Sequence, residues 1–118
     1  MSYILIVDDE SDIRELIAEG LNRLGHEVLE AENGTKALEI VKSQPIKLLV
    51  TDIRMPGGDG ISLIKNLCES ALKTFPIIVM TGFSDMSPDD IVALGANQVL
   101  LKPFRFKEFV EVVKFHLQ

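Results

Sequence analysis

Polar residues follow four short apolar runs of this 118-residue chain, and their types suit chemistry on a phosphoryl group. Asp8 and Asp9 follow residues 3–7, Asp52 follows 47–51, Thr81 follows 76–80 and Lys102 follows 98–101. Carboxylates held close together repel one another unless a cation joins them, and oxygen-only ligands suit a hard ion such as Mg²⁺. A carboxylate can also attack phosphorus and carry an acyl-phosphate intermediate. The pattern therefore indicates Asp52 as a candidate phosphoacceptor.

The remaining polar residues complement this chemistry. A metal and the Lys102 ammonium would neutralise charge on the oxygens of a transferred group, and the Thr81 hydroxyl would donate to another oxygen. Taken singly, each residue has an ordinary structural interpretation: an Asp pair caps turns and helices, and most lysines are solvated. Together, at the ends of four apolar runs, they favour a functional site.

Five candidate strands alternate with five amphipathic helices, which is typical of an α/β fold with a parallel sheet and right-handed crossovers. The predicted strands span residues 3–7, 26–31, 47–51, 76–80 and 98–101. In the first helix, apolar residues recur at helical spacing from Ile13 to Leu24 after Ser11, a predicted N-cap. We expect one domain over residues 1–118, with its site beyond the carboxyl ends of the strands.

Composition excludes several classes of function. The net charge of −6 disfavours binding to nucleic acid, and no apolar run approaches the ~20 residues of a membrane span. Cys68 is the single cysteine, so no internal disulfide can form, and a reducing cytoplasm is favoured. Its place in an apolar helical pattern predicts that Cys68 is buried.

The chain resembles, over essentially its whole length, the receiver domain of two-component response regulators. The matching segments, in order, are Ile6-Val7-Asp8-Asp9-Glu10, Asp52-Ile53-Arg54-Met55-Pro56 with Asp59-Gly60, Met80-Thr81-Gly82, Gly95-Ala96 and Lys102-Pro103-Phe104. An aspartate followed by Met-Pro and Asp-Gly is a specific pattern, and the ordered set is more specific still.

The resemblance implies a flavodoxin-like (βα)5 doubly wound sheet with strand order 2-1-3-4-5. It implies that Asp52 takes a phosphoryl group from a sensor histidine kinase or phosphotransfer protein and signals to a downstream protein or output domain. Such a domain assists its own phosphorylation and slow dephosphorylation, and it is not otherwise an enzyme. The implied Mg²⁺ ligands are Asp8, Asp9, Asp52 and the backbone carbonyl of Arg54. Thr81 matches the switch hydroxyl and Lys102 the phosphate-contacting lysine, with a cis bond to Pro103.

Three features depart from the family pattern. Val99 stands where an aromatic residue usually swings inward with the hydroxyl, and valine cannot make that movement. The segment from Thr81 to Lys102 is about one residue short, which predicts a short fourth helix. Gly57-Gly58 predicts a looser loop after Asp52. We therefore expect competent phosphorylation and atypical signalling.

Two alternatives remain open. A pseudo-receiver would dock to its partner without responding to phosphate, which the altered position Val99 favours. A Mg²⁺-dependent phosphohydrolase related to haloacid dehalogenases would carry a second acid two residues after the nucleophile, where this chain has Arg54. A nucleotide or flavin site would need a glycine-rich loop after the first strand, which is absent from the sequence.

Further expectations concern surfaces. Val112 and Phe115 are predicted on the outer face of the last helix, where they could support a phosphorylation-dependent homodimer. Phe83 and Arg54 are predicted to border the pocket.

Overall fold

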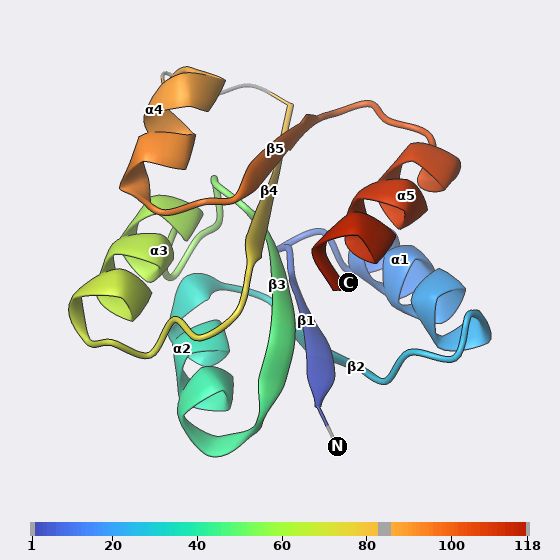
Figure 1. Ribbon diagram of the computed structural model, residues 1–118, viewed down its shortest axis with the longest axis horizontal. Coiled ribbons are helices and arrows are strands. Elements are labelled where there is room, and N and C mark those ends of the chain that lie inside the picture. Colours follow the sequence, from blue (N-terminus) through green and yellow to red (C-terminus); the bar gives the residue numbers. More distant parts are fainter. Residues whose placement is uncertain (1, 83–85, 118) are drawn as a thin grey trace.

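The structure is a computed structural model that describes residues 2–82 and 86–117. Within these residues, five parallel strands alternate with five helices (Figure 1). The elements are β1 (Tyr3–Val7), α1 (Ser11–Arg23), β2 (Val28–Ala31), α2 (Gly34–Ser43), β3 (Ile46–Asp52), α3 (Gly60–Glu69), β4 (Ile77–Thr81), α4 (Pro88–Leu94), β5 (Gln98–Leu101) and α5 (Phe106–Leu117). The strand order β2-β1-β3-β4-β5 confirms the predicted flavodoxin-like sheet.

The strands form because the runs that encode them are almost wholly apolar and both faces of the sheet are covered. Residues 4–7 of β1 and 77–80 of β4 have no exposed surface. Helices α1 and α5 cover one face, and α2, α3 and α4 cover the other (Figure 1). The core accordingly consists of two clusters. Phe109 and Val113 of α5 pack in one, and Leu63, Ile64 and Leu67 of α3 pack in the other.

The register of the sheet brings the polar strand ends to one edge. Val7 pairs with Thr51, so Asp8 and Asp52 stand next to each other where β1 and β3 end. Asp52 in turn pairs with Met80, and Thr81 pairs with Leu101. In a parallel sheet all carboxyl ends lie on the same side, which is the side where ligands bind in such folds.

Helix starts differ in part from the sequence-based expectations. Ser87 caps α4 by accepting a hydrogen bond from the Asp90 N–H. Ser11, in contrast, is the first residue of α1; its N-cap is Glu10, which makes no side-chain cap bond. Asn33 caps α2 by accepting from the Lys36 N–H.

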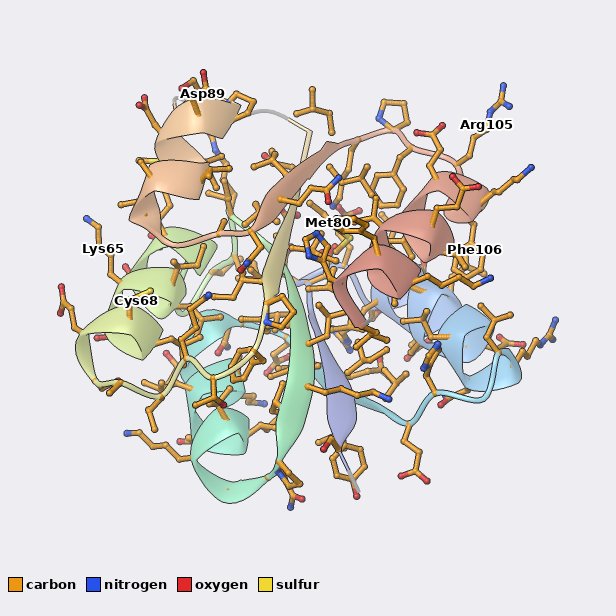
Figure 2. All side chains as sticks on the ribbon, in the orientation of Figure 1. Lys65, Cys68, Met80, Asp89, Arg105 and Phe106 are labelled. Atoms are coloured by element: carbon orange, nitrogen blue, oxygen red, sulfur yellow. The ribbon has the colours of Figure 1, made fainter. Side chains whose placement is uncertain are left out.

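Two side chains from the apolar helical patterns, Leu16 and Cys68, are exposed. Successive residues of a helix point about 100° apart, so Ile17 faces the core while its neighbour Leu16 is 69% exposed. Cys68 follows the buried Leu67 and is likewise exposed on α3, which corrects the prediction of a buried thiol (Figure 2). In α5 the prediction for Val112 is wrong, because its side chain packs against the core.

Strand β2 begins at Val28 rather than at the predicted residue 26, and α4 is short, with seven residues, as the compressed segment before Lys102 predicts. No helix in residues 2–82 and 86–117 has the length and apolar content needed to cross a bilayer.

Candidate functional site

Three carboxylates meet where β1 and β3 end. Asp8 and Asp9 follow β1 directly, and Asp52 is the last residue of β3. Each offers one carboxylate oxygen, and these oxygens all lie within 4.8 Å of one another. Asp8 is fully buried, whereas Asp9 is exposed. Like charges this close cost free energy unless a cation lies among them. The acidic residues singled out from the sequence are therefore brought together.

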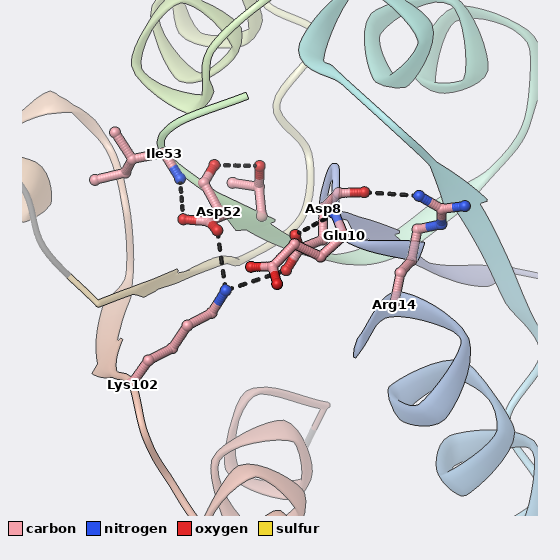
Figure 3. A network of polar contacts seen from close by, with 7 residues as sticks. Asp8, Glu10, Arg14, Asp52, Ile53 and Lys102 are labelled. Atoms are coloured by element: carbon pink, nitrogen blue, oxygen red, sulfur yellow. Dashed lines mark hydrogen bonds and ion pairs between the residues drawn. The ribbon is translucent and has the colours of Figure 1, made fainter. Parts of the chain in front are cut away.

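Lys102 directly follows the carboxyl end of β5, and its ammonium reaches this acidic cluster. Its Nζ lies 2.9 Å from Asp52 Oδ2 and 3.2 Å from Asp8 Oδ2, and it donates to both (Figure 3). The Lys102 backbone N–H donates to the Thr81 carbonyl at 2.9 Å, which continues the pairing of β4 with β5 up to the site. The bond from Lys102 to Pro103 is cis, as predicted.

The charge balance at Lys102 keeps the ammonium protonated. Burial by itself lowers the pKa of Lys102, but the hydrogen bonds and charges of Asp52 and Asp8 outweigh that effect, and the net pKa is raised. A lysine in this setting acts as a compact, permanent positive charge between two carboxylates.

Each of the two contacted carboxylates is also fixed by the backbone. Asp52 Oδ1 accepts from the Ile53 N–H at 2.7 Å, and Asp8 Oδ1 accepts from the Glu10 N–H at 3.0 Å (Figure 3). One oxygen of each carboxylate is thus held by a main-chain donor while the other faces Lys102. The arrangement is preorganised, because neither carboxylate is free to rotate without losing a hydrogen bond.

Thr81 ends β4 on the same edge, and its side chain is almost fully buried. Val99 pairs with Val79 on the neighbouring strand. It packs against the core cluster on the face of the sheet that α2, α3 and α4 cover. Arg54 lies two residues after Asp52, in the loop between β3 and α3. Its predicted role as a carbonyl ligand stays a prediction, and Phe83 lies outside the described residues.

The loop after Asp52 interlocks with the start of α2. The Gly34 N–H donates to the Gly58 carbonyl at 2.8 Å, and Thr35 Oγ1 donates to the Gly57 carbonyl at 2.7 Å. Gly57 and Gly58 have φ angles of +85° and +139°, and a Cβ on Gly58 would lie 2.9 Å from the Thr35 nitrogen. The glycine pair permits this close contact with α2, and the looser loop expected from the sequence stays a prediction.

Gly60 has an even tighter environment. A Cβ at this position would lie 2.1 Å from the backbone oxygen of Asp52, so only glycine fits where α3 starts beside the end of β3. Asp59 caps α3 from the preceding position by accepting from the Ser62 N–H. The Asp-Gly pair thus fixes how the chain leaves the acidic cluster.

The donor set of the acidic cluster fits Mg²⁺. Asp8, Asp9 and Asp52 supply only carboxylate oxygens, and Mg²⁺ binds through a few such oxygens while keeping several waters. No cysteine or histidine belongs to the cluster, whereas those ligands would favour softer metals.

An apolar groove that no sequence pattern predicts borders the site. It has a volume of about 1090 Å³ and runs between α1 and the segment that joins β5 to α5. Lys102 and Gly82 lie at the end nearest the acidic cluster; Leu16, Leu24 and Phe106 contribute exposed apolar surface. The signal in the sequence was Gly20. A Cβ there would lie 2.4 Å from the Phe106 ring, so the ring packs directly over the α1 backbone (Figure 2).

The fold and the acid–lysine site together define a receiver domain. The family model described as the response regulator receiver domain matches residues 4–114. The chain belongs to this family, as its motifs predict. Receiver domains are signalling modules rather than metabolic enzymes.

Curated relatives include both short and longer proteins. The chain is 35% identical to the sporulation initiation phosphotransferase F of Bacillus subtilis, over 97% of the chain and 92% of that protein. It is 38% identical to the probable transcriptional regulator ycf27 of Porphyridium aerugineum over 89% of the chain, which spans only 43% of that relative.

Among solved structures, the response regulator TrrA from Thermotoga maritima aligns with a TM-score of 0.87 and 38% identity. The alignment covers 99% of this chain and 100% of that one. TrrA was solved in complex with Mg²⁺ and BeF.

Proposed function

We propose that residues 1–118 form one receiver domain that takes a phosphoryl group on Asp52. The observation that carries the proposal is the Lys102 ammonium, which bridges Asp52 and the buried Asp8 at 2.9 and 3.2 Å. A cation so placed stabilises the resting carboxylate, and it lies next to the position that the phosphoryl oxygens would occupy on Asp52.

The proposed reaction transfers phosphorus from a histidine nitrogen to a carboxylate oxygen. The Asp52 oxygen forms its bond to phosphorus as the phosphorus–nitrogen bond breaks, and the imidazole leaves with the bonding electron pair. Lys102 then exchanges its contact with the carboxylate for one with a phosphoryl oxygen. The Thr81 hydroxyl donates to another of these oxygens. Slow hydrolysis of the acyl phosphate returns the domain to its resting state.

Asp8, Asp9, Asp52 and the backbone carbonyl of Arg54 would hold Mg²⁺. The ion supplies positive charge against the phosphoryl oxygens when bound. The clustering of the three carboxylates and the Mg²⁺-containing structure of TrrA support this assignment.

The proposed donor is a sensor histidine kinase or phosphotransfer protein, seated in the groove beside α1. A donor protein must bring a phosphohistidine to Asp52, and this groove is continuous with the site through Lys102. Its exposed Leu16 and Phe106 offer an apolar surface to a partner.

The proposed output is a change in contacts with a downstream protein or output domain, in the cytoplasm. The single cysteine and the family membership support this location. A phosphorylation-dependent homodimer stays a prediction. Phe115, which is 67% exposed on α5, would lie in its interface.

The function is tested by incubating the protein with acetyl phosphate and Mg²⁺ and measuring its intact mass. We expect one phosphoryl group per chain on the wild type and none on Asp52→Asn. Asp59→Asn serves as the matched control, because Asp59 caps α3 outside the acidic cluster.

Absence of any adduct on the wild type would contradict the proposal and favour a pseudo-receiver. Release of many phosphates per chain from a phosphomonoester would instead indicate a phosphohydrolase.

A further inference from the structure

Arg14 contacts the acidic cluster from α1, in a way that the proposed reaction does not use. Its Nη1 donates to the backbone carbonyl of Asp8 at 2.8 Å, and its Nε donates to Glu30 Oε1 at 3.0 Å (Figure 3 shows the first contact). The Arg14 side chain is only 15% exposed. The Glu30 side chain is 36% exposed, so the ion pair itself is partly solvated, whereas the contact of Arg14 with the Asp8 carbonyl lies at a fully buried residue.

The Asp8 carbonyl needs such a donor because the sheet ends there. The Asp8 N–H still pairs with the Ala31 carbonyl of β2, but Ala31 is the last residue of that strand. No strand continues beyond it to bind the Asp8 carbonyl, and a buried carbonyl without a donor is costly. Arg14 supplies the donor one helical turn into α1.

Glu30 fixes the direction of the guanidinium. It belongs to β2, whereas Asp8 follows β1, so the fork of Arg14 spans two neighbouring strands from a helix above them. Two hydrogen bonds on adjacent nitrogens hold a planar group far more rigidly than one would. Glu30 also balances the positive charge that Arg14 brings beside the acidic cluster.

We infer that Arg14, oriented by Glu30, is a positioning residue for the cation site formed by Asp8, Asp9 and Asp52. The inference rests on the proposed function. The main chain of Asp8 is held by Arg14 while its two carboxylate oxygens are held by Glu10 and Lys102. The orientation of Asp8, and with it the path of the chain into Asp9, is set before a cation arrives.

Charge and geometry make opposite predictions for the loss of Arg14. A guanidinium acting only through its charge repels Mg²⁺, so its removal would tighten Mg²⁺ binding. A positioning residue orients the ligands, so its removal weakens binding; partners that orient metal ligands typically change affinity by about 10- to 100-fold.

The experiment measures the dissociation constant for Mg²⁺ alone by calorimetry, together with urea unfolding, for four proteins. We expect Arg14→Met to bind Mg²⁺ about 10-fold more weakly than the wild type. Arg14→Lys keeps the charge but cannot bridge both acceptors, and we expect an intermediate loss. The matched control is Arg23→Met, which removes an arginine of the same helix that pairs with Glu19 on the exposed surface. Its affinity should equal that of the wild type.

A spectroscopic signature separates positioning from a purely structural role. The amide of Glu10 donates to Asp8 Oδ1, so its NMR chemical shift should change in Arg14→Met and stay unchanged in Arg23→Met. If Arg14→Met fails to fold, Arg14→Lys carries the test on its own.

The outcomes are distinguishable from failure of the proposed function. A wild type that binds no Mg²⁺ overturns the proposed function and this inference with it. A wild type that binds Mg²⁺ while Arg14→Met and Arg14→Lys bind equally well or more tightly overturns the inference alone, even if the variants are less stable.

Discussion

Replacing Lys102 with methionine tests whether its ammonium holds the acidic cluster together. Methionine keeps much of the aliphatic volume but removes the contacts to Asp52 and Asp8. Asp8 has no exposed surface and Asp52 side-chain exposure is 13%, so neither carboxylate can recover full hydration. Removing one partner of a buried ion pair costs about 3–5 kcal/mol. Lys102 is itself 18% exposed, and we therefore expect a loss near the lower limit, about 3 kcal/mol.

The assay is urea unfolding at pH 7.5, in EDTA and in excess MgCl₂. Because the pKa of Lys102 is raised in the folded state, its contribution is fully present below the ordinary lysine pKa of 10.5 and is lost only as pH rises through the folded value. The full effect is thus measured at pH 7.5. Mg²⁺ at 100 times its dissociation constant contributes about 2.7 kcal/mol. Lys102→Met should therefore gain about 2.7 kcal/mol between EDTA and MgCl₂, which brings its stability close to that of the wild type in EDTA.

Lys107→Met, on the exposed side of α5, is the matched control and should unfold like the wild type in both buffers. Equal stability of Lys102→Met and the wild type in EDTA would refute the electrostatic reasoning. A Lys102→Met variant that MgCl₂ does not stabilise relative to EDTA would show that the three carboxylates do not form a cation site.

Two further predictions concern the groove and His26. Leu16→Glu places a charge in the apolar groove. Phosphorylation by a phosphohistidine protein should therefore slow by about 10-fold or more, while labelling by acetyl phosphate stays unchanged. Equal slowing with both donors would contradict a docking role for the groove. The pKa of His26 is lowered by burial and by the charges of Lys47 and Lys114, so its contribution to stability is present above pH 6.5 and is lost as pH falls through the folded value. Urea unfolding between pH 5 and 8 should show this loss in the wild type and a smaller one in His26→Gln, and identical slopes would refute it.

The sequence predicts the fold and the acidic cluster because both depend on local rules. An apolar run that ends in Asp8 or Asp52 encodes a buried strand and its polar end together, and parallel strands then bring these ends to one edge. The cis bond before Pro103 was expected from the resemblance to receiver domains rather than from a local rule.

Other features depend on distances that no local pattern contains. The pairing of Arg14 with both Asp8 and Glu30 depends on the spacing of α1 from β2, and the groove depends on how closely Phe106 approaches Gly20. Exposure of Leu16 was missed because helical periodicity identifies an apolar stripe but not how much of it the sheet covers.

The interlock between residues 33–35 and 57–60 has a consequence for engineering. Gly58 packs against the backbone of Thr35 with no room for a side chain. A Cβ added to Gly34 would lie 3.0 Å from the Asp59 carbonyl oxygen. Neither segment can be exchanged alone for the sequence of a relative that carries side chains at these positions. A chimaera that alters the loop after Asp52 must transplant the start of α2 with it, so these two segments form a single unit of substitution.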